Sequence, residues 1–115
     1  MYVGEVRDSE TARAMIRAAS NGFLVIATSF GSDIVSGIDT FFQLLGTGYA
    51  ASLASVLRVV VHQSIQNNRF QVQVLTSESP SSPVGSIIRS GQLAQLQNEI
   101  MFQMNHMKSG KPLLG

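Results

Sequence analysis

The first thirty residues show two apolar stretches separated by a segment with helical spacing. Residues 2–6 and 23–27 are largely apolar, and short continuous apolar runs favour parallel strands buried on both faces. Between them, four apolar residues recur every three to four positions: Ala12, Met15, Ile16 and Ala19. This spacing predicts an amphipathic helix, with Asp8 as its N-cap and Asn21-Gly22 as its end. We therefore predict strand, helix, strand.

The middle of the chain predicts two more helices. The first has an apolar stripe and begins at Ser32 or Asp33, either of which can cap it. It should end before Gly46 and Gly48. The stripe comprises Ile34, Val35, Ile38, Phe41, Phe42 and Leu45. A further helix is expected over residues 50–61, although its last residues, Val59-Val60-Val61, also suit the start of a strand.

The carboxyl-terminal third predicts a turn, a strand and two helices. Asn67-Asn68 is typical of a turn, and the alternation that follows in residues 70–74 predicts a half-exposed strand. Residues 76–83 are rich in Ser and Pro and should form a loop. Helices are expected over 84–89 and 92–107, the second ending at Gly110-Lys111-Pro112. Its apolar stripe comprises Leu93, Leu96, Ile100, Met104 and Met107.

Composition narrows the function classes. The 115 residues suffice for one domain at most. Charged residues make up 13%, below the roughly 25% of average domains, which indicates surface that is buried against another chain or segment. The net charge of +1 gives no reason to expect nucleic-acid binding. There is no Cys, no apolar run long enough for a membrane span and no signal peptide, so a cytoplasmic location is expected.

Three polar residues should lie together at one sheet edge. Glu5, Asp8 and Thr28 follow or end the two predicted strands, and ligands of open α/β sheets bind outside the carboxyl ends of strands. Taken alone, however, Glu5 could be an ordinary carboxylate at a strand end, and Thr28 could serve only to satisfy backbone groups.

The amino-terminal stretch resembles the Walker B region of the secretion ATPase superfamily. Members typically read G-E-x-R-D-x-E-T-A, and this chain reads Gly4-Glu5-Val6-Arg7-Asp8-Ser9-Glu10-Thr11-Ala12. The superfamily includes type II secretion, pilus-retraction (twitching motility) and type IV secretion and conjugal transfer ATPases. The similarity continues through Leu57-Arg58, and loosely through Ile87-Ile88-Arg89.

The resemblance implies an α/β fold, namely part of a RecA-like parallel sheet with flanking helices followed by a helical carboxyl-terminal region. Residues 1–76 would be the carboxyl-terminal half of the RecA-like core, and residues 77–115 a helical subdomain. It further implies ATP and Mg²⁺ as cofactors of an intact parent, a hexameric ring, and inner-membrane secretion or pilus platform proteins as partners. No P-loop occurs in this chain, so the chain alone is not expected to bind ATP. We interpret it as a fragment or a truncated gene product.

By this resemblance, Glu5 would act catalytically at the Mg²⁺-bound water. Gly4, Arg7, Asp8 and Thr28 would lie near the nucleotide and Mg²⁺, with Arg7 in a local ion pair and Asp8 as a helix cap. No metal site of the protein's own is expected, because the two His are far apart and Cys is absent.

The remaining candidates have structural interpretations. His62 is expected to pack on an apolar helix, and His106 to be solvated. The methionines at 101, 104 and 107 should serve helix packing or a subunit interface.

Four positions depart from the family pattern. Phe23 and Phe30 stand where relatives have His, Thr40 stands where Arg is usual, and Val74 replaces a frequent Glu. These departures leave a second interpretation open, a non-catalytic interaction or assembly module. A third, an unrelated α/β domain with a chance motif, is disfavoured by the length of the match. The location expected for either secretion protein is the cytoplasm, including peripheral attachment at the inner membrane.

Overall fold

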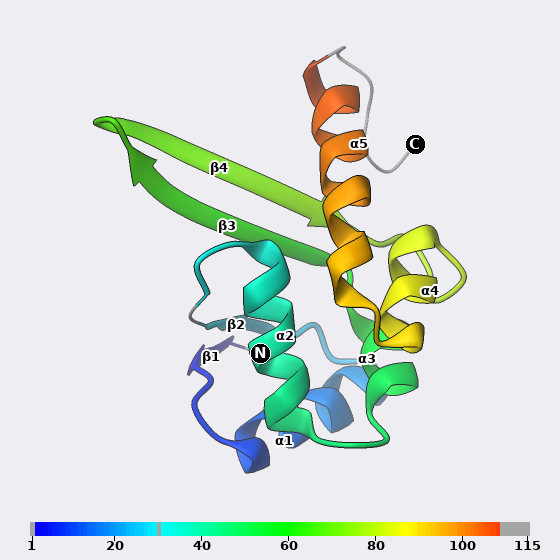
Figure 1. Ribbon diagram of the computed structural model, residues 1–115. Helices are drawn as coiled ribbons and strands as arrows, with labels where there is room; N and C mark the ends of the chain where they lie inside the picture. Colours follow the sequence, from blue (N-terminus) through cyan, green and yellow to red (C-terminus); the bar gives the residue numbers. More distant parts are fainter. Residues whose placement is uncertain (1, 30, 109–115) are drawn as a thin grey trace.

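The computed structural model describes residues 2–29 and 31–108, with side chains up to residue 106. It is a mixed α/β structure, as the sequence predicts, with two separate two-stranded sheets and five α-helices among the described residues. The helices gather into one body, and a long hairpin projects from it (Figure 1).

The amino-terminal strand, helix and strand are confirmed. Strand β1 (Tyr2–Glu5) pairs in parallel with β2 (Ile26–Thr28), and helix α1 (Ser9–Ser20) connects them. Asp8 caps α1 by accepting a hydrogen bond from the Thr11 amide at 2.7 Å. The predicted burial of the second strand is wrong, because only Ile26–Thr28 pair and Leu24 is 74% exposed. With β1 as the single partner strand and no layer over both faces, an apolar run here does not become a buried strand.

Helices carry most of the core. Helix α2 (Ile34–Leu45) begins at Asp33, which forms a capping box with Ser36, and α3 is Ala50–Val56. Helix α4 (Pro83–Ser90), the 3₁₀ turn η1 (Leu93–Gln95) and α5 (Leu96–Lys108) complete the body. The buried cluster joins all of these helices, and its fully buried large side chains are Ile34, Leu45, Leu75, Val84, Ile88 and Leu96.

The predicted helix over 50–61 is too long. Leu57 leaves helical geometry with φ −67° and ψ 131°, and strand β3 (Val59–Gln66) begins two residues later. It pairs antiparallel with β4 (Arg69–Thr76) through the turn at Asn67-Asn68, both of which adopt positive φ. Three consecutive valines favour a strand because their branched side chains are restricted in a helix. The ambiguity at Val59-Val60-Val61 is thus resolved as strand.

The half-exposed strand over 70–74 is confirmed as part of β4, but its apolar side chains are not turned into the core. Phe70 is 64% exposed. The long carboxyl-terminal helix is confirmed as η1 followed by α5, and Leu93, Leu96 and Ile100 are buried as predicted. Its expected end at Gly110-Lys111-Pro112 lies outside the described residues. No helix in the described part of the chain combines the length and the apolar character that a membrane crossing needs.

Candidate functional site

Glu5 and Thr28 lie opposite each other at the carboxyl ends of the two parallel strands. They are cross-strand partners, and the Val6 amide donates a hydrogen bond to the Thr28 carbonyl oxygen at 2.9 Å. The register shifts between Val3 and Glu5, so the bulge lies at Gly4 and directs the chain at the end of β1. The sheet edge predicted from the sequence therefore exists, with Glu5 and Thr28 side by side.

The two carboxylate oxygens of Glu5 have different surroundings. Oε2 accepts a hydrogen bond from Arg7 Nε at 2.6 Å, and the same oxygen forms an ion pair with the Arg7 terminal nitrogen. Oε1 is buried and has no hydrogen-bond partner among the described residues. The Arg7 side chain is 77% exposed whereas that of Glu5 is 23% exposed. One oxygen is thus held by a surface guanidinium, and the other is left unsatisfied beneath it.

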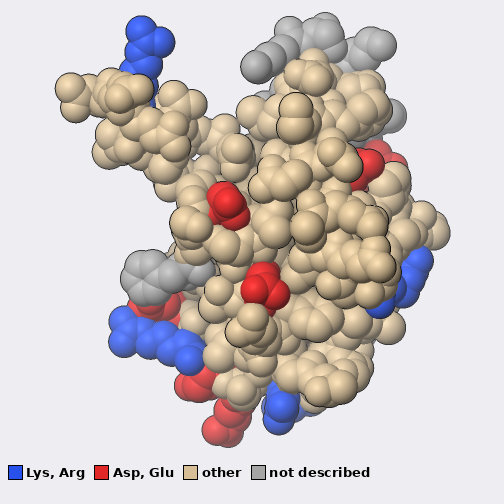
Figure 2. All heavy atoms as spheres, viewed as in Figure 1, with Lys and Arg blue, Asp and Glu red and all other residues tan. Residues whose placement is uncertain are grey.

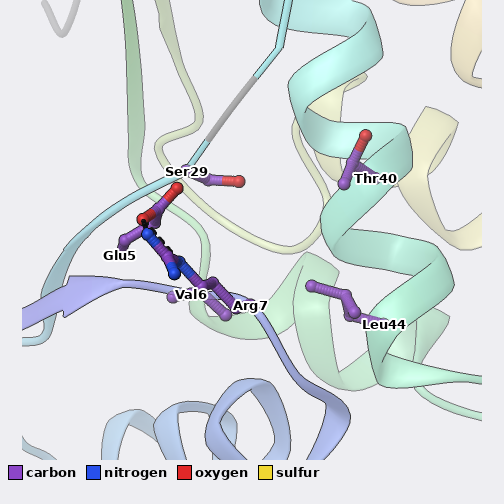
Figure 3. Close-up of a pocket in the computed structure, with 6 residues that line it drawn as sticks. All are labelled: Glu5, Val6, Arg7, Ser29, Thr40 and Leu44. Atoms are coloured by element: carbon purple, nitrogen blue, oxygen red, sulfur yellow. Dashed lines mark hydrogen bonds and ion pairs between the residues drawn. The ribbon is translucent and has the colours of Figure 1, made fainter.

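A small hollow opens beside this carboxylate. It has a volume of about 340 Å³ and is lined by Glu5, Val6, Arg7, Ser29, Thr40 and Leu44. These residues come from the end of β1, the segment after β2, and α2 (Figure 3). Its size lies at the lower end of the range for small-molecule pockets. The wall also contains the hydroxyl-bearing residues Ser29 and Thr40 and the apolar residues Val6 and Leu44.

Asp8 acts on α1 and does not line the hollow. Its carboxylate is exposed and accepts the Thr11 amide hydrogen bond. That backbone hydrogen bond, followed by one from the Thr11 side chain, holds the pKa of Asp8 below its ordinary value of 3.8. The ion pair of Arg7 and the helix cap of Asp8 are therefore both present, while Gly4 contributes backbone at the bulge.

The predicted position of His62 on a helix is wrong. His62 lies on β3, half-buried, and its Nε2 is 3.1 Å from the Gly31 carbonyl oxygen. A carbonyl oxygen can only accept, so Nε2 carries the donated proton. On its other side Gly31 packs against α2, because a Cβ at this position would lie 2.6 Å from the Gly37 Cα. The segment after β2 is thereby held between β3 and α2.

His106 and the three methionines named above are the remaining candidate residues, and they lie on α5. The predicted solvation of His106 is wrong, since it is half-buried with its ring centroid 4.3 Å from that of Phe102. Met104 packs against the core and Met101 is exposed, while the Met107 side chain lies outside the described part. Among the described residues, no three His, Cys, Asp or Glu side chains gather into a metal site.

Sequence reasoning missed Ser29 and Leu44 as residues of the hollow. Ser29 had a signal, since it directly follows Thr28 at the strand end. In the sequence Thr40 stands out only as a departure from the family pattern, because its place in the wall depends on how α2 packs. No local pattern could indicate Leu44, which lies outside the apolar stripe predicted for this helix.

Comparison with known proteins agrees with the resemblance in the amino-terminal stretch. The uncharacterized protein YggR of Escherichia coli (strain K12) is 33% identical over 108 residues, an alignment that covers 87% of this chain and 32% of YggR. The chain therefore spans about a third of the length of this relative. Residues 1–100 match the Type II/IV secretion system protein family, and the chain belongs to that family.

Proposed function

We propose that this chain is the part of a hexameric motor ATPase that carries the catalytic carboxylate, Glu5. Residues 1–76 would form the carboxyl-terminal half of the RecA-like core and residues 77–115 a helical subdomain. The intact protein would power type IV pilus dynamics, or type IV secretion and conjugal DNA transfer. The observation that carries this proposal is the buried Glu5 Oε1, which has no hydrogen-bond partner among the described residues at the end of β1.

The residues at this edge fit the Mg²⁺ that would accompany ATP in the intact protein. An unsatisfied buried carboxylate oxygen is costly, and a metal-bound water would supply its missing donor. Mg²⁺ keeps several of its waters and needs few protein carboxylates when phosphates ligate it, so a site with one carboxylate is sufficient. Bound Mg²⁺ and nucleotide would supply the charge stabilisation of phosphoryl transfer.

Each residue of the edge has a task in this proposal. Arg7 holds Oε2 and thereby fixes the direction of Oε1. Oε1 would orient a water beside the Mg²⁺ and accept its proton as the water attacks the γ-phosphorus of ATP and ADP leaves. Gly4 and Thr28 would lie at the nucleotide side of the edge, where the Thr28 hydroxyl could donate a hydrogen bond, and Asp8 caps the first turn of α1.

Assembly and location follow the same proposal. The ring would be a homo-oligomer that contacts inner-membrane secretion or pilus platform proteins, in the cytoplasm or peripherally at the inner membrane. The low charged fraction of 13% supports extensive contact with other chains.

A non-catalytic assembly module is the second candidate, and Thr40 favours it. Relatives usually have Arg where Thr40 stands, and here this short, uncharged residue lines the hollow. Phe23, where relatives have His, is 62% exposed and offers no hydrogen bond. Phe30, at the other His position, lies outside the described residues. Such a module would keep the fold for ring assembly without turnover.

Two measurements test the proposal. The 115-residue chain alone should show no Mg²⁺-dependent binding of a fluorescent ATP analogue, because the phosphate cradle of a P-loop is absent from its sequence. Micromolar binding would contradict this. The second measurement uses assembled rings of a protein in which these residues follow a P-loop segment. There Glu5→Gln should lower ATP turnover by roughly 10²–10⁴-fold.

Glu10→Gln is the matched control for the second measurement. It makes the same chemical change at an exposed position in the first turn of α1, and turnover should stay at the wild-type level. If Glu5→Gln leaves turnover unchanged, the site is not catalytic and the assembly module replaces the ATPase.

A further inference from the structure

One face of the β3–β4 hairpin is apolar and exposed. Cross-strand partners share a face, and the register pairs the odd-numbered residues of β3 with the even-numbered residues of β4. We call this face the outer face. It comprises Val59, Val61, Gln63, Ile65, Phe70, Val72, Val74 and Thr76. It is exposed except at the base of β4, where Val74 is half-buried and Thr76 is buried. Six of its eight side chains are Val, Ile or Phe, and none is charged.

The opposite face of the hairpin is polar and turned toward the body. It carries His62, which bonds to Gly31, and it ends at Arg69, the one charged residue in 59–76. In β3 the outward residues are exposed whereas Val60, His62 and Ser64 are half-buried. Ile65 on the outer face is 74% exposed. A sheet covered on one side usually packs its apolar face on the core and exposes its polar face. In this hairpin the polar face is turned toward the body and the apolar face is exposed.

A two-stranded sheet with an uncovered apolar face is not stable on its own. Isolated hairpins are marginal in water and need a third strand or a packed layer. The distal half of this hairpin extends beyond the helices (Figure 1), and its surface is uncharged apart from a basic side chain near the tip (Figure 2). Large exposed apolar patches of this kind mark interaction surfaces.

The chemistry of the outer face fits a second copy of the same face. Two uncharged faces bring no like charges together when they stack. Each strand has eight residues and so spans about 26 Å. In a two-fold arrangement, the bulky Ile65 and Phe70 near the tip of one hairpin would lie over the smaller Val59 and Val61 near the base of the other.

The area is sufficient for a weak specific dimer. Five strongly exposed apolar side chains on each copy, at roughly 100 Å² for each side chain, would bury on the order of 1,000 Å² in total. That is the lower bound for a biological interface.

We propose that the outer face of the hairpin is a self-association surface, on which two copies of this chain stack hairpin on hairpin in antiparallel orientation. The contact is isologous, and packed aligned sheets lie about 10 Å apart. It is separate from the hollow at Glu5, whose lining contains no hairpin residue, and it does not depend on ATP.

Sedimentation of the full 115-residue chain tests the surface. The wild type should form dimers at about 0.1 mM, whereas Ile65→Lys should weaken dimerisation by roughly 100-fold, because it buries two unpaired charges in the interface. Gln66→Lys is the matched control, since Gln66 is the next residue along β3, is exposed and belongs to the opposite face. It should dimerise as the wild type does, and circular dichroism should show that both variants are folded. A monomeric wild type, or a dimer that withstands Ile65→Lys, overturns the proposal.

Cross-linking tests the orientation independently of stability. The chain contains no Cys, so Gln63→Cys places a single thiol near the middle of the outer face, close to the proposed two-fold axis. Mild oxidation should join two copies through it, while Ser64→Cys on the opposite face should remain unlinked. Equal cross-linking of the two variants overturns the stacking proposal.

Discussion

The two carboxylate oxygens of Glu5 differ because Arg7, two residues along the chain, holds only one of them. In an extended strand, residues i and i+2 point to the same side, and the chain is still close to extended where it leaves β1. Arg7 can therefore reach back to Oε2, while Oε1 is buried. A carboxylate held on one oxygen by a local partner keeps its orientation without help from distant parts of the fold.

The Asp8 cap should give α1 a measurable dependence on pH. Because the folded pKa lies below the ordinary value of 3.8, the ionised cap contributes full stability above that value. The contribution is lost as the pH falls through the still lower folded pKa. Asp8→Asn keeps an acceptor but removes the charge at the helix amino terminus. Its melting temperature should therefore be lower than that of the wild type at neutral pH, and the difference should vanish under strongly acidic conditions.

Thermal melts over a pH series check this expectation. Glu78→Gln, a change at an exposed loop carboxylate, should give no comparable difference. A gap between wild type and Asp8→Asn that stays constant from neutral to acidic pH would show that Asp8 does not stabilise the fold through its charge.

The residues of the site differ in how well the sequence alone predicts them. Glu5 and Thr28 could be predicted because strand ends are readable from short apolar runs, and parallel strands bring their ends together. His62 could not, because its partner Gly31 lies 31 residues away. The same holds for Thr40, which reaches the hollow only through the packing of α2.

At the scale of elements, helical periodicity was the more dependable signal. The stripes in α2 and α5 point into the core because an amphipathic helix needs only one covered face. The burial of strands is harder to predict, because it depends on how many strands and helices pack against an apolar run. The run at 23–27 has one partner strand and stays exposed, and Val59-Val60-Val61 becomes a strand because a pairing partner, β4, follows it.

Two helical glycines should respond in opposite ways to the same substitution. A Cβ on Gly85 in α4 would lie 3.0 Å from the Ser79 carbonyl oxygen and closer still to the Pro80 carbonyl. Gly85→Ala should therefore lower the free energy of unfolding by about 1–3 kcal/mol through overpacking. Gly37 in α2 has open space at its Cβ position, so Gly37→Ala should raise it by about 0.5–1 kcal/mol.

Urea denaturation of both variants measures these changes under one set of conditions. Each variant is the control for the other, since both add a methyl group inside a helix. If the two substitutions change the free energy of unfolding equally, helix propensity alone explains the change. The close approach of Gly85 to Pro80 then does not affect stability.

At the scale of the whole molecule, stability is distributed unevenly. One buried cluster joins the helices and reaches the hairpin only at its base, where Leu75 is buried. There Gln103 of α5 donates to the Thr76 carbonyl oxygen at 2.9 Å and accepts from the Thr76 amide at 2.8 Å. The hairpin is thus fixed at one end and self-supported at the other.

Hydrogen exchange should follow this division. In dilute protein, amides near the turn at Asn67-Asn68 should exchange far faster than those of α2 and α5, because local opening there costs few buried contacts. Amides near the base of β4, around Leu75, should be slow. Uniform protection along the whole hairpin at low concentration would contradict this picture.

The contact between His62 and Gly31 also connects the hairpin to the sheet edge at Glu5 and Thr28. His62 lies about halfway along β3, with the fixed base of the hairpin on one side and the free tip on the other. The hairpin therefore contacts the segment that carries Ser29 at a point about halfway along β3. Tilting of the tip would be transmitted through one imidazole to Gly31, which packs against the backbone of α2 at Gly37. A force applied at the tip of the hairpin, some 13 Å away along the strand, would thus act on the segment beside Glu5.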